Sequence, residues 1–543
     1  MADSDQSARS GSGTLLLIFI QVASRALTFA GNQFLLRFLS PSLLGIAVQL
    51  ELVSVTTLYF ARESLRVALQ RQTPETKDPT KEDSPNTSRQ EKDSQTIVNL
   101  SYLAVLLGLV VSFFFGLSYL RSAPEEVLDS PCFDISFRIY AFATLVEQLA
   151  EPAFVVIQQK ALYRERARAE TVAAIARCIA ACSTAFVGNM RGLAPSILPF
   201  AVGQAAYAVI LLALYLLPTI QISQKERFSL TPRKVAAASS PEVTYYYANL
   251  FHVGLLSLAA TMYMQSIFKL LLTQGDALIL SFLSTLADQG AFALASNYGG
   301  LLARLVFQPV EESSRNTFGR LLSAPSSRTT SAEKSPMSRE QRQALKYLAN
   351  TLHLYMLMAL PLVSIAPYVL PVVVRHVIGA DWYTASTSTL LSTYCYYIPL
   401  MAVNGILDAF VTSAATTSQL HAQSLWMLLF TGIYGAAAWT MLTTLQLGAA
   451  GLVGANMFNM VLRIVWSGCF IRGWIQDEAK DSAAVQKETL KEALPATSSL
   501  AVTALVVAGL RMNLLTAQSD GEELNRQFMG FLVAGTVLLG STM

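Results

Sequence analysis

Two stretches of the sequence repeat a pattern of charged and polar residues inside an apolar background. Residues 21–40 (QVASRALTFAGNQFLLRFLS) align without a gap with residues 265–284 (QSIFKLLLTQGDALILSFLS), and the alignment places Arg25 opposite Lys269. A cation inside an apolar segment can neutralise an anionic group in a membrane, and ionisable residues in such segments usually serve a function. An internal repeat of this kind indicates a transporter built from two related halves.

The first copy of the repeat places its polar residues on one helix face, at positions i, i+4, i+7 and i+11: Gln21, Arg25, Thr28 and Asn32. At 1.5 Å per residue, Arg25 lies roughly 20 Å from each end of its span, near the middle of a bilayer. We predict that Arg25 and Lys269 face each other and hold an anionic headgroup. The alternative is that a membrane acid neutralises each cation, which then only braces helices. The predicted substrate-binding residues of this central cationic cavity are Arg25, Lys269, Asn32, Asp276, Gln21, Gln265, Arg177 and Arg463.

Three acids inside apolar segments are candidate partners for these cations: Glu147, Glu151 and Asp408. The first two continue a polar stripe that begins at Tyr140, and Asp408 ends a second stripe that begins at Tyr397. The acids could pair with Arg25 and Lys269, or they could load a proton or a sodium ion. We favour structural ion pairing, because buried charges need partners.

Similar charged blocks follow the second and the eighth predicted spans. Residues 62–66 (RESLR) resemble residues 311–315 (EESSR). We predict that both blocks lie at the cytoplasmic mouth, where they either form an ionic latch between the halves or extend their charges to the membrane interface. The predicted gate residues are Arg62, Glu63, Arg66, Glu311, Glu312 and Arg315.

The composition indicates the elements that must position these residues. Apolar residues make up 53% of the chain and charged residues 14%, well below the roughly 25% of a soluble protein. The pattern predicts an all-α polytopic membrane protein of about fourteen helices. The predicted spans are 13–38, 43–61, 97–120, 133–157, 169–189, 195–217, 257–286, 288–310, 345–370, 387–411, 423–446, 449–471, 494–511 and 526–542.

The distribution of basic residues predicts the orientation of the chain. Five loops that follow even-numbered spans hold 27 of the 39 lysines and arginines. By the positive-inside rule, these loops and both termini are cytoplasmic. The two copies of the repeat are six spans apart, so both cross the membrane in the same direction, and we predict an axis between the halves near the membrane normal.

These observations predict two pseudo-symmetric six-helix lobes plus two C-terminal helices. The N-terminal lobe covers 13–218, after a cytoplasmic N-terminus at 1–12, and it includes a disordered cytoplasmic loop at 70–96. The C-terminal lobe covers 257–472 and includes a cytoplasmic loop at 318–344, most of it disordered. Cytoplasmic linkers occupy 219–256 and 473–493, and two extra helices occupy 494–543. Residues 243–265 either lengthen the seventh span or form a separate interfacial helix.

Several classes of function find no support in the sequence. The five cysteines and four histidines lack the spacing of metal ligands, so we expect no metal and no cofactor. The chain has no Walker A motif, and a net charge of +3 gives no indication of nucleic acid, so neither a nucleotide nor a nucleic acid is an expected partner. We therefore expect a protein that is not an enzyme. The sequons at Asn86 and Asn99 fall on the predicted cytoplasmic side, so neither should carry a glycan.

Four motifs together resemble the Rft family of endoplasmic-reticulum proteins for oligosaccharide-lipid translocation, from the first helix to the twelfth. They are Phe60-Ala61-Arg62-Glu63, Glu147 with Glu151-Pro152, Leu272-Thr273-Gln274-Gly275-Asp276, and Phe307-Gln308-Pro309-Val310-Glu311-Glu312-Ser313. The resemblance implies the multidrug/oligosaccharidyl-lipid/polysaccharide exporter superfamily, whose two six-helix lobes agree with the repeat. The implied ligand is dolichyl-diphosphate Man5GlcNAc2, which must reach the lumenal leaflet for protein N-glycosylation.

The resemblance turns the repeat into a hypothesis about mechanism. Arg25 and Lys269 would neutralise the diphosphate, the polyprenyl tail would stay in lipid, and rocking of the lobes would open the site to the lumen. Endoplasmic-reticulum membrane lipids are the other expected partners. Two alternatives remain: a non-transporting accessory protein of the dolichol-linked oligosaccharide pathway, and an ion-coupled small-molecule antiporter on the same fold.

Overall fold

A computed structural model describes residues 28–71, 86–160, 162–235, 246–322, 337–479 and 481–517. The chain divides into two compact units, Met1–Ser281 and Phe282–Met543. Within the described residues, nine helices are long and apolar enough to cross a membrane, and a bent pair of helices near the C-terminus brings the total to ten if it counts as one span. These coincide with ten of the fourteen predicted spans.

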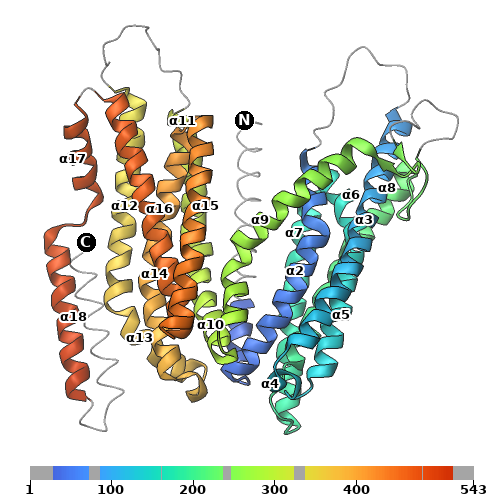
Figure 1. Ribbon diagram of the computed structural model, residues 1–543, viewed down its shortest axis with the longest axis horizontal. Coiled ribbons are helices and arrows are strands. Elements are labelled where there is room, and N and C mark those ends of the chain that lie inside the picture. Colours follow the sequence, from blue (N-terminus) through green and yellow to red (C-terminus); the bar gives the residue numbers. More distant parts are fainter. Residues whose placement is uncertain are drawn as a thin grey trace, which may run out of the picture. The chain divides into compact units, whose positions relative to one another are not determined.

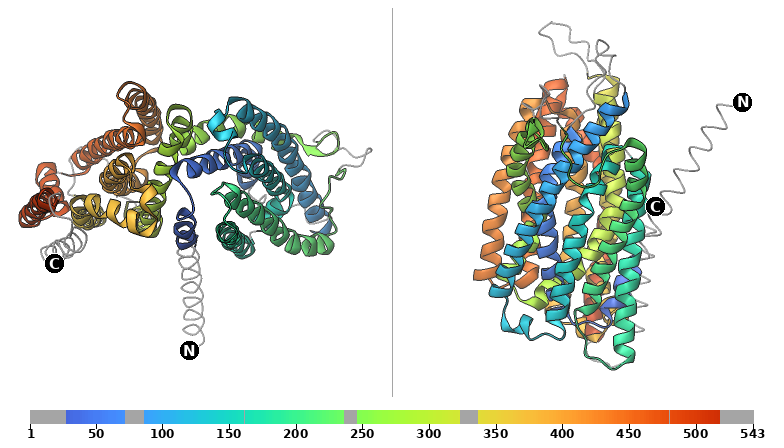
Figure 2. Two further views of the ribbon diagram at one scale, coloured as in Figure 1. Left: turned by 90° about the horizontal axis from the view of Figure 1, so that it is seen from below. Right: turned by 90° about the vertical axis from the view of Figure 1, so that its right-hand side faces the viewer.

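The first unit is a bundle of helices that run beside one another (Figures 1 and 2). Its elements are helical residues 28–36, α2 (Pro41–Arg71), α3 (Asn86–Ser122), α4 (Glu125–Leu128), α5 (Phe133–Leu149), α6 (Glu151–Gln159), α7 (Tyr163–Met190), α8 (Leu198–Glu226), the antiparallel strands β1 (Tyr246–Tyr247) and β2 (Phe251–His252), and α9 (Val253–Leu283). A buried cluster that includes Ile97, Phe154 and Leu211 holds α3, α6 and α8 together.

The second unit is also helical (Figure 1). Its elements are α10 (Leu286–Leu302), the π-helix η2 (Ala303–Phe307), α11 (Gln308–Leu322), α12 (Arg339–Ser364), α13 (Ala366–Val377), the 3-10 turn η3 (Ala380–Trp382), α14 (Ala385–Ala414), α15 (Thr417–Trp439), the π-helix η4 (Thr440–Thr444), α16 (Gly448–Glu478), α17 (Ser482–Ala493) and α18 (Thr497–Ala517). Its core joins α11, α14 and α16 through the rings of Phe318, Phe410 and Trp474, which meet edge to face at 5.2 and 5.4 Å.

The two copies of the repeat end in the same local structure. In the first copy, Ser40 precedes α2, and its hydroxyl accepts a hydrogen bond from the Leu43 backbone at 3.3 Å. In the second copy, α9 ends at Leu283. Thr285, one residue beyond this copy, caps α10, and its hydroxyl accepts a hydrogen bond from the Asp288 backbone at 3.2 Å. Such side-chain caps satisfy backbone donors that the first helical turn leaves free. Within the described residues, each copy therefore leads from a helix through a short turn into a capped second helix.

Several predicted loops are helical, which corrects the sequence analysis. Helix α3 begins at Asn86, so residues 86–96 are not disordered, and Ser94, Gln95 and Thr96 are buried. Helices α16 and α17 occupy most of the predicted linker 473–493. The predicted loop 318–344 is helical at both ends, because α11 runs to Leu322 and α12 begins at Arg339. A periodic apolar pattern ends where a helix leaves the membrane, although the helix itself can continue with polar residues.

The boundary between the halves also differs from the prediction. The compact units divide between residues 281 and 282, so most of α9 belongs to the first unit, whereas the prediction began the C-terminal lobe at residue 257. Leu255 and Ala259 of α9 pack in a buried cluster with Leu65 and Leu100. Residues 253–265 lengthen the seventh helix, as one of the two alternatives proposed, and residues 246–252 form a short hairpin. The predicted span 526–542 lies outside the described residues.

Candidate functional site

The predicted two-sided cationic site is only partly covered by the structure. Gln21 and Arg25 lie outside the described residues. Gln265 and Lys269 lie one turn apart on α9, and Asp276 lies half-buried two turns further along the same helix. Asn32 is exposed on the helical segment 28–36. The proposal that Arg25 and Lys269 hold an anion therefore stays a prediction.

A buried ion pair joins α2 to α5 in the first unit. The Arg62 guanidinium donates to a Glu147 carboxylate oxygen at 2.9 Å, and the Gln204 amide of α8 lies 3.4 Å from the other oxygen. The Glu147 side chain is only 6% exposed, whereas that of Arg62 is 20% exposed. A carboxylate buried to this degree requires a partner, and Arg62 supplies it.

A second ion pair lies one helical turn further along α2. Arg66 donates to both carboxylate oxygens of Glu151, from Nε at 2.7 Å and from Nη2 at 2.5 Å. Its guanidinium also lies over the Phe154 ring, 3.7 Å from the ring centroid. The two-pronged geometry and the aromatic stack are contacts that arginine makes and lysine does not. The break between α5 and α6 at Ala150, next to Pro152, lets Glu151 and Phe154 both reach Arg66.

These side chains surround a small polar cavity of about 50 Å³, also lined by Glu170, Tyr207 and Tyr215. The volume suits one or two water molecules and excludes a sugar or a diphosphate. Glu170 accepts hydrogen bonds from Arg166 at 2.9 Å and from the Tyr215 hydroxyl at 3.2 Å. With three arginines against three glutamates, this cluster is electrically balanced. Its geometry fits a structural brace that links α2, α5, α6, α7 and α8.

Arg177, which we predicted as a wall of the cationic cavity, forms an ion pair instead. Its guanidinium donates to Glu51 of α2 at 2.9 Å. Glu51 was not among the predicted charge partners, although an acid in the middle of the predicted span 43–61 is a clear signal that a partner is needed. Arg177 is therefore not a free cation.

The second unit holds its own charged cluster. Arg315 donates to Glu311 at 2.7 Å and lies 3.7 Å from Asp408, and the Gln423 amide donates to the other Asp408 oxygen at 2.9 Å. Arg463 of α16 lies close enough to Glu311 to attract its carboxylate. The acid that we predicted as a partner for Arg25 or Lys269 thus has partners within its own unit.

The predicted gate residues form their ion pairs inside single units. Arg62 and Arg66 bind acids of the first unit, and Arg315 binds acids of the second unit. Glu63 lies half-buried on α2, and Glu312 is exposed on α11. A latch between the halves stays a prediction. The pairing of Glu147 and Glu151 with Arg62 and Arg66 joins two groups of residues that the sequence analysis had treated separately.

An open cavity of about 620 Å³ lies beside the second cluster. Its lining residues are Ala303, Phe307, Gln308, Glu311, Glu312, Arg315 and Met401. The π-helix η2 forms one wall, and α11 and α14 form the others. Volumes between roughly 300 and 1,000 Å³ are typical of small-molecule sites. Among the cavities described in this chain, this one has both the size and the polarity to receive a polar ligand.

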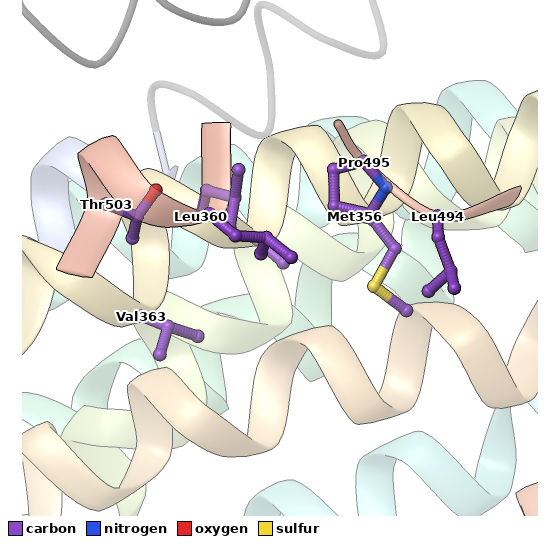
Figure 3. Close-up of a pocket in the computed structure, with 8 residues that line it drawn as sticks. Met356, Leu360, Val363, Leu494, Pro495 and Thr503 are labelled. Atoms are coloured by element: carbon purple, nitrogen blue, oxygen red, sulfur yellow. The ribbon is translucent and has the colours of Figure 1, made fainter. Parts of the chain in front are cut away.

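A third cavity, of about 240 Å³, lies where α12 meets the bend between α17 and α18 (Figure 3). Figure 3 shows Met356, Leu360 and Val363 of α12 opposite Leu494 and Pro495. Thr503 contributes the one hydroxyl of this lining. An apolar cavity of this kind cannot stabilise a charged headgroup, so it is not the candidate site for one.

Comparisons with known proteins connect these features to a family. The family described as "Rft-1: Rft protein" matches residues 9–543. The chain is 33% identical over 484 residues to the "Man(5)GlcNAc(2)-PP-dolichol translocation protein RFT1" of Yarrowia lipolytica, covering 85% of this chain and 70% of that protein. It is 31% identical over 496 residues to the protein of the same name in Saccharomyces cerevisiae, covering 88% and 84%.

A solved structure shows the same fold. The lipid II flippase MurJ, in an inward closed conformation, aligns over 97% of this chain and 98% of its own with a TM-score of 0.61. The sequences are 13% identical, so the likeness concerns the fold alone. The predicted polytopic, all-α transporter fold is confirmed, and the count of fourteen helices is tested only in the described residues.

Proposed function

Because the chain belongs to the Rft family, we propose that it moves dolichyl-diphosphate Man5GlcNAc2 from the cytosolic to the lumenal leaflet of the endoplasmic reticulum membrane, where the lipid serves protein N-glycosylation. The observation that carries the proposal is the similarity to yeast proteins named for this translocation, which extends over most of each chain. The flippase-like fold and the multi-pass architecture support it.

The ligand presents three chemical problems to a protein in a membrane. Its diphosphate carries charge that is very costly to transfer bare into apolar surroundings. Its sugars carry many hydroxyl groups, each of which needs a hydrogen-bond partner. Its polyprenyl tail is apolar and can remain in lipid throughout. A translocation protein must therefore supply cations and polar groups along its path, while the tail needs no protein contact.

We propose that Arg25 and Lys269 supply the cations for the diphosphate. Arg62, Arg66 and Arg177 of the first unit are each paired with a glutamate, so these three arginines add little net positive charge. The side chains of Arg62, Arg66 and Arg177 are 20%, 21% and 33% exposed, and each already has a carboxylate partner.

We also propose that the ligand leaves chemically unchanged, so the protein is not an enzyme and needs no cofactor. The basic loops support an orientation with both termini in the cytoplasm. An epitope tag at either terminus should be accessible in cells whose plasma membrane alone is permeabilised. Protection of a terminal tag until the endoplasmic reticulum is opened would contradict this orientation.

The proposal can be tested with purified protein in vesicles that contain labelled lipid-linked heptasaccharide. A lectin added outside captures lipid that reaches the outer leaflet, so the rate of capture reports translocation. The protein with Arg25→Gln and Lys269→Gln should translocate at least tenfold more slowly than the unmodified chain. The expected loss follows from removing both charges that oppose the diphosphate.

A matched control changes two exposed cations outside the predicted site, Arg164→Gln and Lys487→Gln. It removes the same net charge and should translocate at the normal rate. Unmodified protein that gives no faster capture than protein-free vesicles would favour a non-transporting accessory role. Capture that requires a proton or sodium gradient would add ion coupling to the mechanism.

A further inference from the structure

The open cavity of the second unit differs in charge from a site for a diphosphate. Glu311 and Glu312 line it together with one cation, Arg315. Asp408 adds a third acid beside Arg315, and Arg463 adds a second cation near Glu311. Among the side chains that the structure describes there, three carboxylates against two guanidinium groups leave a net charge of −1. These charges oppose an anion, whereas they do not oppose a neutral polar ligand.

The groups that face the cavity suit hydroxyl groups. A carboxylate accepts several hydrogen bonds and an amide both donates and accepts, so together they satisfy hydroxyls in either direction. Gln308 and Glu312 are exposed, and within the described residues neither forms a hydrogen bond or an ion pair. The Phe307 ring provides an apolar surface beside them. This mixture of an aromatic ring with uncommitted amide and carboxylate groups is complementary to a sugar ring.

The backbone around the cavity is arranged to present these side chains. The π-helix Ala303–Phe307 directly precedes Gln308, and single π-turns are frequent at functional sites because they change the direction of the residues that follow. On the opposite wall, α14 has a glycine where it approaches Glu311. A Cβ at Gly405 would lie 2.9 Å from a Glu311 carboxylate oxygen. Because Gly405 has no side chain, the Glu311 carboxylate can lie against α14 at this point.

Arg315 has a supporting role in this arrangement. It holds Glu311 at 2.7 Å and lies 3.7 Å from Asp408, which is itself fixed by Gln423. These contacts hold Glu311 and Asp408 in position. Glu312 and Gln308 remain available for a ligand. The cavity therefore has a fixed inner wall and a pair of free polar groups at its opening.

We propose that this cavity binds the neutral sugars of the ligand, and that other residues contact the diphosphate. The inference rests on the proposed function, which supplies an oligosaccharide headgroup, and it assigns a separate place to the uncharged part. With a volume of about 620 Å³, the cavity takes only part of a heptasaccharide. Glu312 and Gln308 bind sugar hydroxyls, and Phe307 packs against a ring face.

The test uses the full-length protein in lipid nanodiscs and two separate probes. One probe is the free heptasaccharide Man5GlcNAc2 without lipid, and the other is a short prenyl diphosphate without sugar. Binding of each probe is measured by calorimetry. Glu312→Gln and Gln308→Ala should each weaken binding of the heptasaccharide about five- to tenfold, while the affinity for the prenyl diphosphate stays within twofold.

Two further variants sharpen the result. Glu340→Gln removes an exposed carboxylate from the first turn of α12, outside the cavity, and should change neither affinity. Gly405→Ala leaves every charge in place but displaces Glu311, so it should weaken the heptasaccharide selectively. Since Gln308 and Glu312 are exposed, both variants should fold, and an unchanged melting temperature checks this.

The possible outcomes separate this inference from the proposed function. Unchanged heptasaccharide binding in both cavity variants would overturn the sugar site, even if the unmodified protein translocates lipid. Weaker binding of the prenyl diphosphate instead would also overturn it, because the cavity would then hold the anion. Selective loss of sugar binding in a protein that does not translocate in vesicles would support the sugar site and contradict the proposed function.

Discussion

The ion pair between Arg66 and Glu151 should be the most stabilising charged contact of the first unit. The Glu151 side chain is only 3% exposed, and Arg66 reaches both of its oxygens while it stacks on Phe154. Removing one partner of a buried pair costs about 3–5 kcal/mol, because the other charge is left uncompensated. Glu151→Gln should therefore destabilise the protein by about that amount.

Melting of the purified protein in detergent measures this effect. At roughly 2 °C per kcal/mol for a unit of this size, the melting temperature should fall by roughly 6–10 °C. The matched control is Glu165→Gln, because Glu165 pairs with Arg168 at the surface of the same unit at 3.8 Å, with 40% and 69% of the two side chains exposed. Exposed pairs contribute at most about 1 kcal/mol, so the control should shift the melting temperature by no more than roughly 2 °C.

A double variant separates the pair from its surroundings. Arg66→Met with Glu151→Met replaces both charges by apolar side chains of similar length, which is often neutral or stabilising for a buried pair. The double variant should therefore melt at a higher temperature than Glu151→Gln. The reasoning is refuted if Glu151→Gln shifts the melting temperature no more than Glu165→Gln, or if the double variant is less stable than the single one.

Three further predictions concern single contacts and are checked by melting of the purified protein. Gly31→Ala should lower the free energy of unfolding by about 1–3 kcal/mol, because its new Cβ would clash with the Cys178 sulfur. Cys178→Ala should restore most of this loss, and no rescue would contradict the close contact. Asn99→Leu should cost about 2–4 kcal/mol, since the buried amide bonds the backbone of Arg233 in both directions and also Leu250; a loss below about 1 kcal/mol would argue against these bonds. Ser338→Ala should cost about 1 kcal/mol by removing the capping box of α12, and an unchanged melting temperature would show that the cap contributes nothing.

The sequence predicted most of the described membrane helices, because these depend on local pattern. Apolar runs of about 20 residues defined most spans, and a capped helix start follows each copy of the repeat, at Ser40 and at Thr285. The polar ends of the helices were not predicted, because the apolar pattern that marks a span ends at the membrane surface. The start of α12 does have a sequence signal, because Ser338 and Gln341 form a capping box and match the S-x-x-Q pattern of this motif.

The partners of the charged residues could not be predicted in the same way. Arg62 and Glu147 are 85 residues apart, and only the packing of α2 against α5 brings them together. The sequence indicated that buried acids need cations, but it offered several cations for each acid. Glu51 illustrates the limit most clearly, because it was overlooked although it neutralises a predicted cavity residue, Arg177.

The buried amide of Asn99 gives a structural reason for the prediction that this residue carries no glycan. Its side chain is fully buried and forms hydrogen bonds with the segment that precedes the β-hairpin and with the hairpin itself. A glycan on this nitrogen would be incompatible with the fold, whichever side of the membrane it faced. The sequon at Asn99 should therefore remain unmodified in the native protein.

The most direct test of translocation by this chain alone is to count active vesicles as a function of protein copies. Purified protein is reconstituted at ratios from below one to several copies per vesicle, and the fraction of vesicles that expose their labelled lipid-linked heptasaccharide is measured. If the chain translocates the lipid, this fraction rises with the ratio as random occupancy requires and approaches one. A fraction that stays at the level of protein-free vesicles at every ratio would contradict the account.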